Sequence, residues 1–345
     1  MTADLLVVAP HATRSGSTRV LLDLLCSDQR PEGLDVALEL ASGGAMEDEL
    51  RTVARAPEAG EGAPVVLANS AVAAGALLEV APGTATVAYV HETHRVLVGL
   101  RPASIDGLRS ADLVLCVSEG VADGAAALGV DPGRIEVLPP VFRPAPPADA
   151  EAVAAIRAEL APDGPLVVAC GEARWVKGAD LFLELAAALR HEPPVAMVWI
   201  GRRQRGFVRL LDVVRRTLGP DGEVTWYGEV DDVAPYLAAA DALVVPSREE
   251  AQPLVPLEAA AQGTPTACFE VGGLAELVAD GAAVGAPYPD VYALAGALAP
   301  LLDGSGAGVA LVEAARGRAA ARQAPEVVGR RFWEVVGGLG MLRTS

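Results

Sequence analysis

The stretch that decides the fold reads Ala242-Leu-Val-Val-Pro-Ser-Arg-Glu-Glu-Ala-Gln-Pro-Leu-Val-Pro-Leu-Glu-Ala-Ala-Ala-Gln-Gly-Thr-Pro265. Its first four residues form a short apolar run, which predicts a buried parallel strand that ends at Pro246. Apolar side chains then recur at helical spacing from Leu254 to Ala261, and Gly263 ends the helix together with Pro265. The stretch therefore predicts a strand, a polar loop and a helix.

Two glutamates and two backbone N–H groups make this stretch a candidate binding site. Glu250 lies on the loop, and Glu258 lies one to two turns into the helix. The N–H groups of Leu254 and Val255 lie near the helix start, where they lack a partner inside the helix and can bind phosphate. Because an ionised carboxylate accepts hydrogen bonds, the glutamates favour a ligand that also carries hydroxyl groups. A sugar joined to a nucleoside diphosphate has both features.

Short apolar runs alternate with helical patterns along most of the chain. The predicted strands are residues 5–9, 35–40, 64–68, 86–90, 112–117, 135–138, 166–170, 196–200, 224–227, 242–245 and 265–269. Strands that alternate with helices predict an α/β chain with doubly wound parallel sheets. In such sheets ligands bind at the carboxyl ends of the strands.

A proline-rich segment divides the chain. Residues 139–147 contain five prolines in nine positions, which excludes a helix and predicts a stiff connector. We therefore expect two Rossmann-like domains, residues 1–143 and residues 144–326.

The charge balance limits the partners. The net charge of −18 argues against a nucleic-acid partner and disfavours stable association with an anionic membrane. The four cysteines form no C-x-x-C pair, so the sequence predicts neither zinc nor any other bound metal. The N-terminus lacks the basic region of a signal peptide, and no apolar run reaches the roughly 18 residues of a membrane span. We expect a cytoplasmic protein.

The order of residues in the opening stretch and just after it resembles a known signature. Glu250-x7-Glu258, then Gly263-x-Pro265, then Val271-Gly-Gly-Leu-Ala-Glu276 is similar to the donor site of the retaining glycosyltransferases of family 4, the group 1 glycosyltransferases. The resemblance implies the GT-B fold, in which an acceptor-side domain and a donor-binding domain face a central cleft. It also implies that the C-terminal segment 327–345 packs back on the first domain. The residues alone equally allow that segment to pack on its own domain.

The implied activity is transfer of a hexosyl or related sugar from a nucleoside-diphosphate sugar. The resemblance implies retention, displacement on the same face as the leaving diphosphate, and no cofactor beyond the nucleotide sugar as co-substrate. The charge balance favours a small soluble acceptor. The sugar, the base, the acceptor and the oligomeric state stay open.

Cations on two loops are candidates for holding the diphosphate. Arg174 and Lys177 lie in the loop 171–178, where fixed positive charge would stabilise the leaving group. The family resembled often has an arginine five residues before the lysine, but this chain has Glu172 there. Lys177 is thus the firmer assignment, and Arg202 is an alternative to Arg174.

The resemblance also assigns roles on the donor side. It implies that Glu250 binds hydroxyls of the transferred sugar, that Glu258 holds the ribose, and that the base packs against Gly228 and Glu229. Prolines at positions 253 and 256 remove N–H donors, so we expect the phosphate contacts to come mainly from Leu254 and Val255.

On the first domain, two residues are candidates for the site. His91 directly follows a predicted strand and matches the family histidine that lies near the reacting sugar, so we assign it a catalytic role with Lys177 and Glu250. His94 is its rival. Gly16 leaves room for close backbone approach of a ligand.

Two alternatives stay open. One is a pseudo-glycosyltransferase, or a sugar-nucleotide-binding protein, that couples a non-sugar partner such as a cyclitol. The other is a nicotinamide-dependent dehydrogenase, which needs a G-x-G-x-x-G motif that neither glycine-containing loop, 171–178 or 201–206, supplies.

Overall fold

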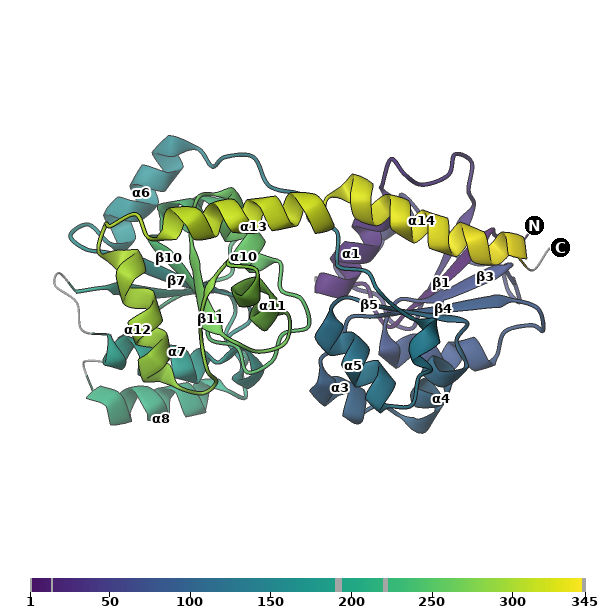
Figure 1. Ribbon diagram of the computed structural model, residues 1–345, viewed down its shortest axis with the longest axis horizontal. Helices are drawn as coiled ribbons and strands as arrows, with labels where there is room; N and C mark the ends of the chain where they lie inside the picture. The colour runs from purple at the N-terminus through teal and green to yellow at the C-terminus, as the bar shows by residue number, and fades with distance from the viewer. Residues whose placement is uncertain (1, 14, 190–193, 220–222, 343–345) are drawn as a thin grey trace. The chain divides into compact units, whose positions relative to one another are not determined.

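The computed structural model describes residues 2–13, 15–189, 194–219 and 223–342. The chain forms two compact units, which we call the N-terminal unit (residues 1–143 with 321–345) and the C-terminal unit (residues 144–320). Each unit contains one parallel sheet, and helices cover both sheets (Figure 1). The predicted α/β class with two doubly wound parallel sheets is confirmed. That the units face a shared cleft stays a prediction.

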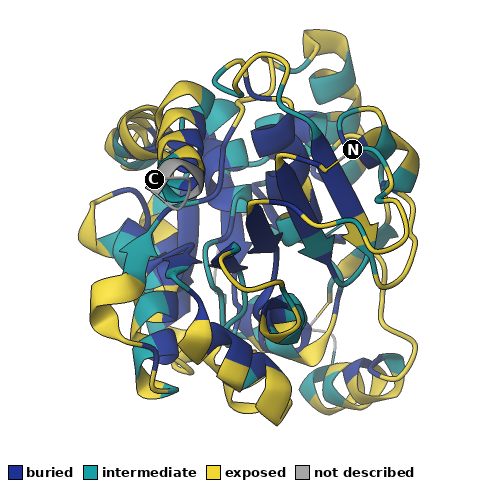
Figure 2. Ribbon diagram, turned by 90° about the vertical axis from the view of Figure 1, so that its right-hand side faces the viewer, coloured by how far each residue is buried: buried dark blue, intermediate teal, exposed yellow. Residues whose placement is uncertain are grey.

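The sheet of the N-terminal unit has the order β2-β1-β3-β4-β5-β6, and all of its strands are parallel. The strands are β1 (Leu5–Ala9), β2 (Val36–Leu40), β3 (Val65–Ala68), β4 (Ala85–Val90), β5 (Leu113–Cys116) and β6 (Ile135–Val137). The helices before the connector are α1 (Gly16–Leu25), α2 (Glu47–Arg51), η1 (Ala71–Leu78), α3 (His94–Val98), α4 (Pro102–Ser110), α5 (Glu119–Ala127) and η2 (Pro132–Arg134). Strand β4 is buried along its whole length, as expected for an inner parallel strand. Figure 2 shows most strands in the dark blue of buried residues, with exposed residues on helices and loops.

The last helix, α14 (Pro325–Leu342), belongs to the N-terminal unit and packs on α1, β3 and β4 (Figure 1). Phe332 is fully buried. Arg331 forms a bidentate ion pair with Glu136, with N···O distances of 2.5 and 2.7 Å. Before α14, the backbone N–H of Phe142 in the connector donates to the carbonyl of Gln323 at 2.7 Å. Residues 343–345 of the predicted C-terminal segment lie outside the described residues.

The sheet of the C-terminal unit has the order β12-β11-β10-β7-β8-β9 and is also parallel throughout. Its strands are β7 (Leu166–Cys170), β8 (Ala196–Ile200), β9 (Thr225–Gly228), β10 (Ala242–Val245), β11 (Thr266–Phe269) and β12 (Val284–Ala286). Its helices are α6 (Ala150–Leu160), η3 (Trp175–Lys177), α7 (Ala179–Ala188), α8 (Val208–Leu218), α9 (Ala234–Ala239), α10 (Val255–Ala261), α11 (Gly273–Ala279), α12 (Val291–Leu302) and α13 (Gly308–Arg322).

Helices α7, α8 and α12 lie against the sheet (Figure 1). Their apolar side chains pack with the strands into one core, in which Phe182 meets Trp199 edge-on at 5.4 Å. The sequence prediction missed β12, because three residues that include a glycine give too short a pattern. It also placed β9 one residue too early, at 224–227.

The strand order locates the point at which each sheet changes direction. In the C-terminal unit the chain runs outward from β7 through β8 to β9, then returns to the other side of β7 with β10. In the N-terminal unit the same change falls between β1 and β3. Loops that leave neighbouring strands at such a point diverge and leave space for a ligand. The loops after β7 and β10, and those after β1 and β3, are therefore where a site is expected.

Candidate functional site

The loops after β7 and β10 touch along their backbones. The N–H of Arg248 donates to the carbonyl of Val176 at 2.9 Å. Gly178 has φ +71°, and a Cβ there would lie 1.9 Å from the carbonyl oxygen of Pro246. Only glycine fits such a contact in such a conformation. The sequence Val-Lys-Gly178 thus brings the lysine-bearing loop against the glutamate-bearing loop.

Lys177 and Glu250 form an ion pair where these loops meet. Lys177 Nζ lies 2.6 Å from Glu250 Oε1, and the side chains are 27% and 10% exposed. The hydroxyl of Ser247 donates to the same carboxylate oxygen at 2.7 Å. Two predicted site residues from distant parts of the sequence are therefore brought together at the change of strand order.

A second ion pair fixes the Glu250 loop on helix α7. Arg248 donates to both carboxylate oxygens of Asp180, each at 2.8 Å, and the side chains are 10% and 11% exposed. The guanidinium also donates to the carbonyl of Trp175 at 2.6 Å and lies 4.5 Å from the centre of its ring. Burial opposes the charge on Arg248, but the Asp180 carboxylate outweighs it and raises the pKa of Arg248. Sequence analysis missed this pair.

The Val271-Gly-Gly segment supports the Glu250 loop from behind. The N–H of Gly273 donates to the carbonyl of Glu250 at 3.1 Å. A Cβ on Gly272, which has φ +49°, would lie 1.8 Å from that same carbonyl oxygen. The side-chain oxygen of Gln252 is buried beside Gly273 and has no hydrogen-bond partner among the described residues. It is an acceptor that a water or a ligand can satisfy.

Both candidate arginines converge on Glu172. Arg202 Nη2 lies 3.0 Å from a Glu172 oxygen, and Arg174 Nε lies 3.9 Å from the other. Backbone hydrogen bonds hold the two loops in register, with Ala173 N–H donating to the Arg202 carbonyl at 2.8 Å. The glutamate that departs from the family pattern thus holds two cations. The carbonyl of Arg174 accepts the N–H of Lys177 at 3.1 Å, but neither guanidinium forms an ion pair with Glu250 in the described part of the chain.

Glu258 lies on the short helix α10, on the side of β7. Burial of the Cys170 thiol, with the negative charge of Glu258 as the second cause, raises the pKa of Cys170 to about 12. The carboxylate is therefore near Cys170, at the end of β7. Leu254 precedes the first helical residue, Val255, and α10 has only seven residues. Its dipole is correspondingly small, so the two predicted N–H donors act mainly as individual hydrogen-bond donors.

Gly228 and Glu229 lie at the end of the edge strand β9. The carbonyl of Gly228 accepts the N–H of Gly201 at 2.6 Å, and its φ of +95° explains why glycine occupies this turn. Glu229 is exposed. Among the described residues, no hydrogen bond or ion pair joins Gly228 or Glu229 to Lys177 or Glu250.

In the N-terminal unit, Asn69 joins His91 to the first turn of α1. His91 Nε2 lies 3.1 Å from Asn69 Oδ1, and Asn69 Nδ2 donates to the carbonyl of Ser17 at 3.2 Å. The imidazole packs on Tyr89 with ring centres 4.2 Å apart. Burial lowers the pKa of His91 to about 3, so the ring is neutral at ordinary pH.

The other residues predicted on this unit are placed differently. His94 is exposed at the start of α3. Gly16 begins α1, and a Cβ there would meet nothing within 4 Å, so no described protein atom requires a glycine at this position.

Sequence analysis also missed Glu92. Its carboxylate accepts the hydroxyl of Ser70, the N–H of Ala71 at 3.0 Å and the N–H of His91 at 2.9 Å. It thus fixes the backbone at which His91 leaves β4.

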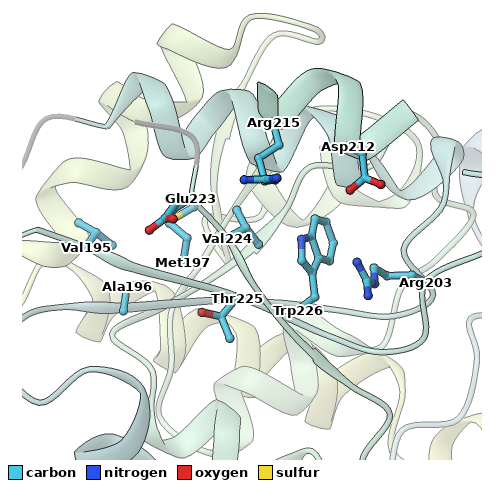
Figure 3. A pocket seen from close by; sticks show the side chains of 10 residues that line it. All are labelled: Val195, Ala196, Met197, Arg203, Asp212, Arg215, Glu223, Val224, Thr225 and Trp226. Carbon is cyan, nitrogen blue, oxygen red and sulfur yellow. The ribbon is translucent and has the colours of Figure 1, made fainter. Parts of the chain in front are cut away.

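A separate cavity of about 470 Å³ lies between α8 and strands β8 and β9 (Figure 3). Arg215 reaches from α8 towards the sheet, and Arg203 lies 5.9 Å from the centre of the Trp226 ring (Figure 3). None of the predicted site residues lines this cavity. Asp212 and Glu223 face the two arginines across it, so its charges balance and it does not single out an anion.

Within the described ranges, no group of three or more His, Cys, Asp or Glu side chains is placed to hold a metal ion. No described helix is both long and apolar enough to cross a membrane.

Comparison with known sequences identifies part of the chain. Residues 164–304 match the family model of the glycosyl transferases group 1. A D-inositol 3-phosphate glycosyltransferase of Xylanimonas cellulosilytica is 33% identical over 177 residues, which cover 49% of this chain and 42% of the relative. D-inositol 3-phosphate glycosyltransferase 2 of Catenulispora acidiphila is 35% identical over 193 residues, 51% of this chain and 44% of the relative. The chain thus spans less than half the length of these curated relatives.

Solved structures match nearly the whole chain in fold. Anabaena Alr3699/HepE, crystallised with UDP and glucose, has a TM-score of 0.81 at 18% identity and covers 97% of this chain and 99% of its own. Sucrose-phosphate synthase from Thermosynechococcus elongatus has a TM-score of 0.77 at 20% identity, with coverage of 98% and 100%. At these identities the likeness establishes the fold, which is that of the GT-B glycosyltransferases.

The Arg248–Asp180 pair leads to a prediction about stability. Asp180→Asn leaves a buried guanidinium without its counter-charge, which should lower the free energy of unfolding by about 3 kcal/mol. The exposed pair Asp106–Arg109, at 3.5 Å, supplies the control Asp106→Asn, with an expected loss below about 1 kcal/mol. Urea unfolding measures both. Equal losses would mean that the buried pair does not hold the loop.

The low pKa of His91 leads to a prediction about pH. Between about pH 6.5 and about pH 3 the unfolded chain binds a proton at this position and the folded chain does not, so acid destabilises the fold. The free energy of unfolding of wild type relative to His91→Gln should therefore fall by about 2 kcal/mol between about pH 7.5 and about pH 5. Urea unfolding at both pH values gives this difference. A difference that does not depend on pH would show that the folded ring titrates normally.

Proposed function

The chain carries a group 1 glycosyl transferase domain over residues 164–304, and from this premise we propose that it transfers a sugar from a nucleoside-diphosphate sugar to a small acceptor. The expected resemblance to this family is confirmed for that domain. The Lys177–Glu250 pair at the change of strand order carries the proposal. A cation and a carboxylate that touch each other there match a ligand with adjacent phosphate and hydroxyl groups.

Donor binding would exchange the partners within this pair. The diphosphate would take the ammonium of Lys177, and a sugar hydroxyl would replace that ammonium on Glu250. Ser247 keeps the carboxylate oriented during the exchange, because its hydroxyl bonds to the same oxygen at 2.7 Å. The loop itself need not move, since Arg248, Gly178 and Gly273 fix its backbone.

The rest of the donor would extend across the carboxyl edge of the sheet. Glu258 would hold the ribose hydroxyls, Leu254 and Val255 would donate N–H groups to phosphate, and the base would pack near Gly228 and Glu229. UDP is the first nucleotide to test, because it is bound in a structure that shares the fold.

The reaction would proceed with retention and without a metal ion. As the sugar–phosphate bond breaks, negative charge grows on the diphosphate, and Lys177, with Arg174 or Arg202, would offset that charge. The acceptor hydroxyl would attack from the face that the diphosphate leaves, and its proton would pass to the leaving phosphate oxygen.

For the acceptor we propose a small soluble molecule that the enzyme meets in the cytoplasm. The sequence relatives are named for action on D-inositol 3-phosphate, which favours a polyhydroxylated ring. The net charge of −18 disfavours an acceptor embedded in an anionic bilayer. A pseudo-glycosyltransferase, or a sugar-nucleotide-binding protein that couples a cyclitol-like partner, is the second candidate. The relatives are named as glycosyltransferases, which favours the first candidate.

Removal of the Lys177 ammonium tests the chemical role. Lys177→Ala should lower turnover with the donor by roughly 10² to 10³, the usual loss for one preorganised electrostatic contact. Arg205→Ala is the matched control. It also removes one positive charge, but at an exposed position of the neighbouring loop, and it should change turnover little. Release of nucleoside diphosphate from a panel of nucleotide sugars measures both. Turnover of Lys177→Ala within about threefold of wild type would remove Lys177 from the reaction.

The two glutamates should respond differently to substitution. Glu258→Ala should weaken binding of free UDP by at least about tenfold, because the ribose diol loses a charged acceptor. Glu250→Ala should bind UDP at least as tightly as wild type, because it frees the Lys177 ammonium, and should lose transfer, because the partner of Glu250 in the reaction is the sugar. Calorimetric titration with UDP, followed by a turnover assay, separates the two effects. The same loss of UDP affinity in both variants would contradict this division of roles.

A further inference from the structure

Asn69 is a buried polar residue to which the proposed reaction assigns no role. It directly follows β3, at the change of strand order in the N-terminal unit, and is only 2% exposed. Its amide joins the first turn of α1 to the end of β4, through Ser17 on one side and His91 on the other. A buried amide with a partner at each end has a defined orientation, and that orientation decides whether Asn69 presents a donor or an acceptor to His91.

The contact with Ser17 fixes which end of the amide faces His91. The Ser17 group is a backbone carbonyl, which can only accept a hydrogen bond, so the amino end of Asn69 must face it. The reversed amide would place two oxygens against each other. The oxygen of Asn69 therefore faces His91, and that oxygen can only accept.

The orientation of Asn69 in turn fixes the tautomer of His91. To bond to an acceptor at 3.1 Å, Nε2 must carry a hydrogen. The ring is neutral, so its other nitrogen, Nδ1, carries a lone pair and no proton. Tyr89 does not compete for this nitrogen, because its hydroxyl donates to the carbonyl of Leu138 at 2.9 Å. The nearest carboxylate along the chain, Glu92, accepts the backbone N–H of His91.

We propose that Asn69 is a positioning residue that holds His91 as the Nε2–H tautomer, so that Nδ1 can only accept a hydrogen bond. At Nδ1, His91 would select a ligand group that donates a hydrogen bond, such as a hydroxyl. It would reject a carbonyl or a fully ionised phosphate oxygen, because these groups only accept. The choice of substrate class rests on the proposed function. The tautomer does not, since it follows from contacts within the unliganded N-terminal unit.

The tautomer can be observed directly by ¹⁵N nuclear magnetic resonance of the intact, ligand-free chain. The sequence contains four histidines, so His91→Gln and His94→Gln suffice to identify the signal of His91. We expect a protonated Nε2 and an unprotonated Nδ1 that do not change between about pH 5 and 8. In the chain with Asn69 unchanged, a proton on Nδ1, or an imidazolium between about pH 5 and 8, would overturn the proposal.

Substitution of Asn69 tests whether this residue is the cause. Asn69→Leu keeps the approximate shape and removes the acceptor, so the His91 signals should shift towards a mixture of tautomers. Asn69→Asp places a negative charge against Nε2 and should bring the titration of the ring into the range from about pH 5 to 8. An unchanged tautomer and titration in both folded variants would mean that Asn69 does not set the state of His91.

Kinetics separate this proposal from the proposed function. If the chain is a transferase, kcat/KM of Asn69→Asp should acquire a new ionisation that wild type lacks, and Asn69→Leu should lose roughly tenfold, the effect of one hydrogen bond. Loss of activity without a new ionisation in Asn69→Asp would overturn the positioning role. Absence of transfer in wild type, with the tautomer as described, would overturn the proposed function and leave this assignment standing.

Discussion

The contact between Lys177 and Glu250 is the interaction on which the site depends. It joins the loop after β7 to the loop after β10, and its atoms lie only 2.6 Å apart. The backbones of the loops around this pair also approach more closely than side chains usually permit. Gly178 allows the approach from one side and Gly272 supports it from the other. The Arg248–Asp180 pair then holds the loop against α7, so the position of Glu250 is fixed before any ligand binds.

Under the proposed function, the ion pair would let a strongly acidic chain hold an acidic ligand. The three cations assigned to the diphosphate are already paired, Lys177 with Glu250 and both Arg174 and Arg202 with Glu172. Pairing keeps these side chains in place without a ligand, and a diphosphate must displace carboxylates to reach them. Hydroxyl groups of the same ligand can replace the cations on the carboxylates. A ligand that carries both kinds of group therefore restores more contacts than inorganic phosphate could.

The sequence predicted the elements that depend on local pattern. Buried parallel strands appear as continuous apolar runs, so the strands that precede Lys177, Glu250 and His91 were located correctly. The close backbone contacts at Gly178 and Gly272 were not predicted from the sequence. The pairings that position the site residues were not predictable in this way. Arg248 and Asp180 are 68 residues apart, and Asn69 is 22 residues from His91 and 52 from Ser17, so no local spacing reveals them.

A double-mutant cycle on UDP binding tests the central interaction most directly. Calorimetry would compare wild type, Lys177→Met, Glu250→Gln and the double variant. The account predicts weaker UDP binding for Lys177→Met and tighter binding for Glu250→Gln, because loss of the carboxylate charge frees the ammonium for the diphosphate. In the double variant the gain from Glu250→Gln should disappear. Independent, additive effects of the two substitutions would contradict the claim that the diphosphate and Glu250 exchange places on Lys177.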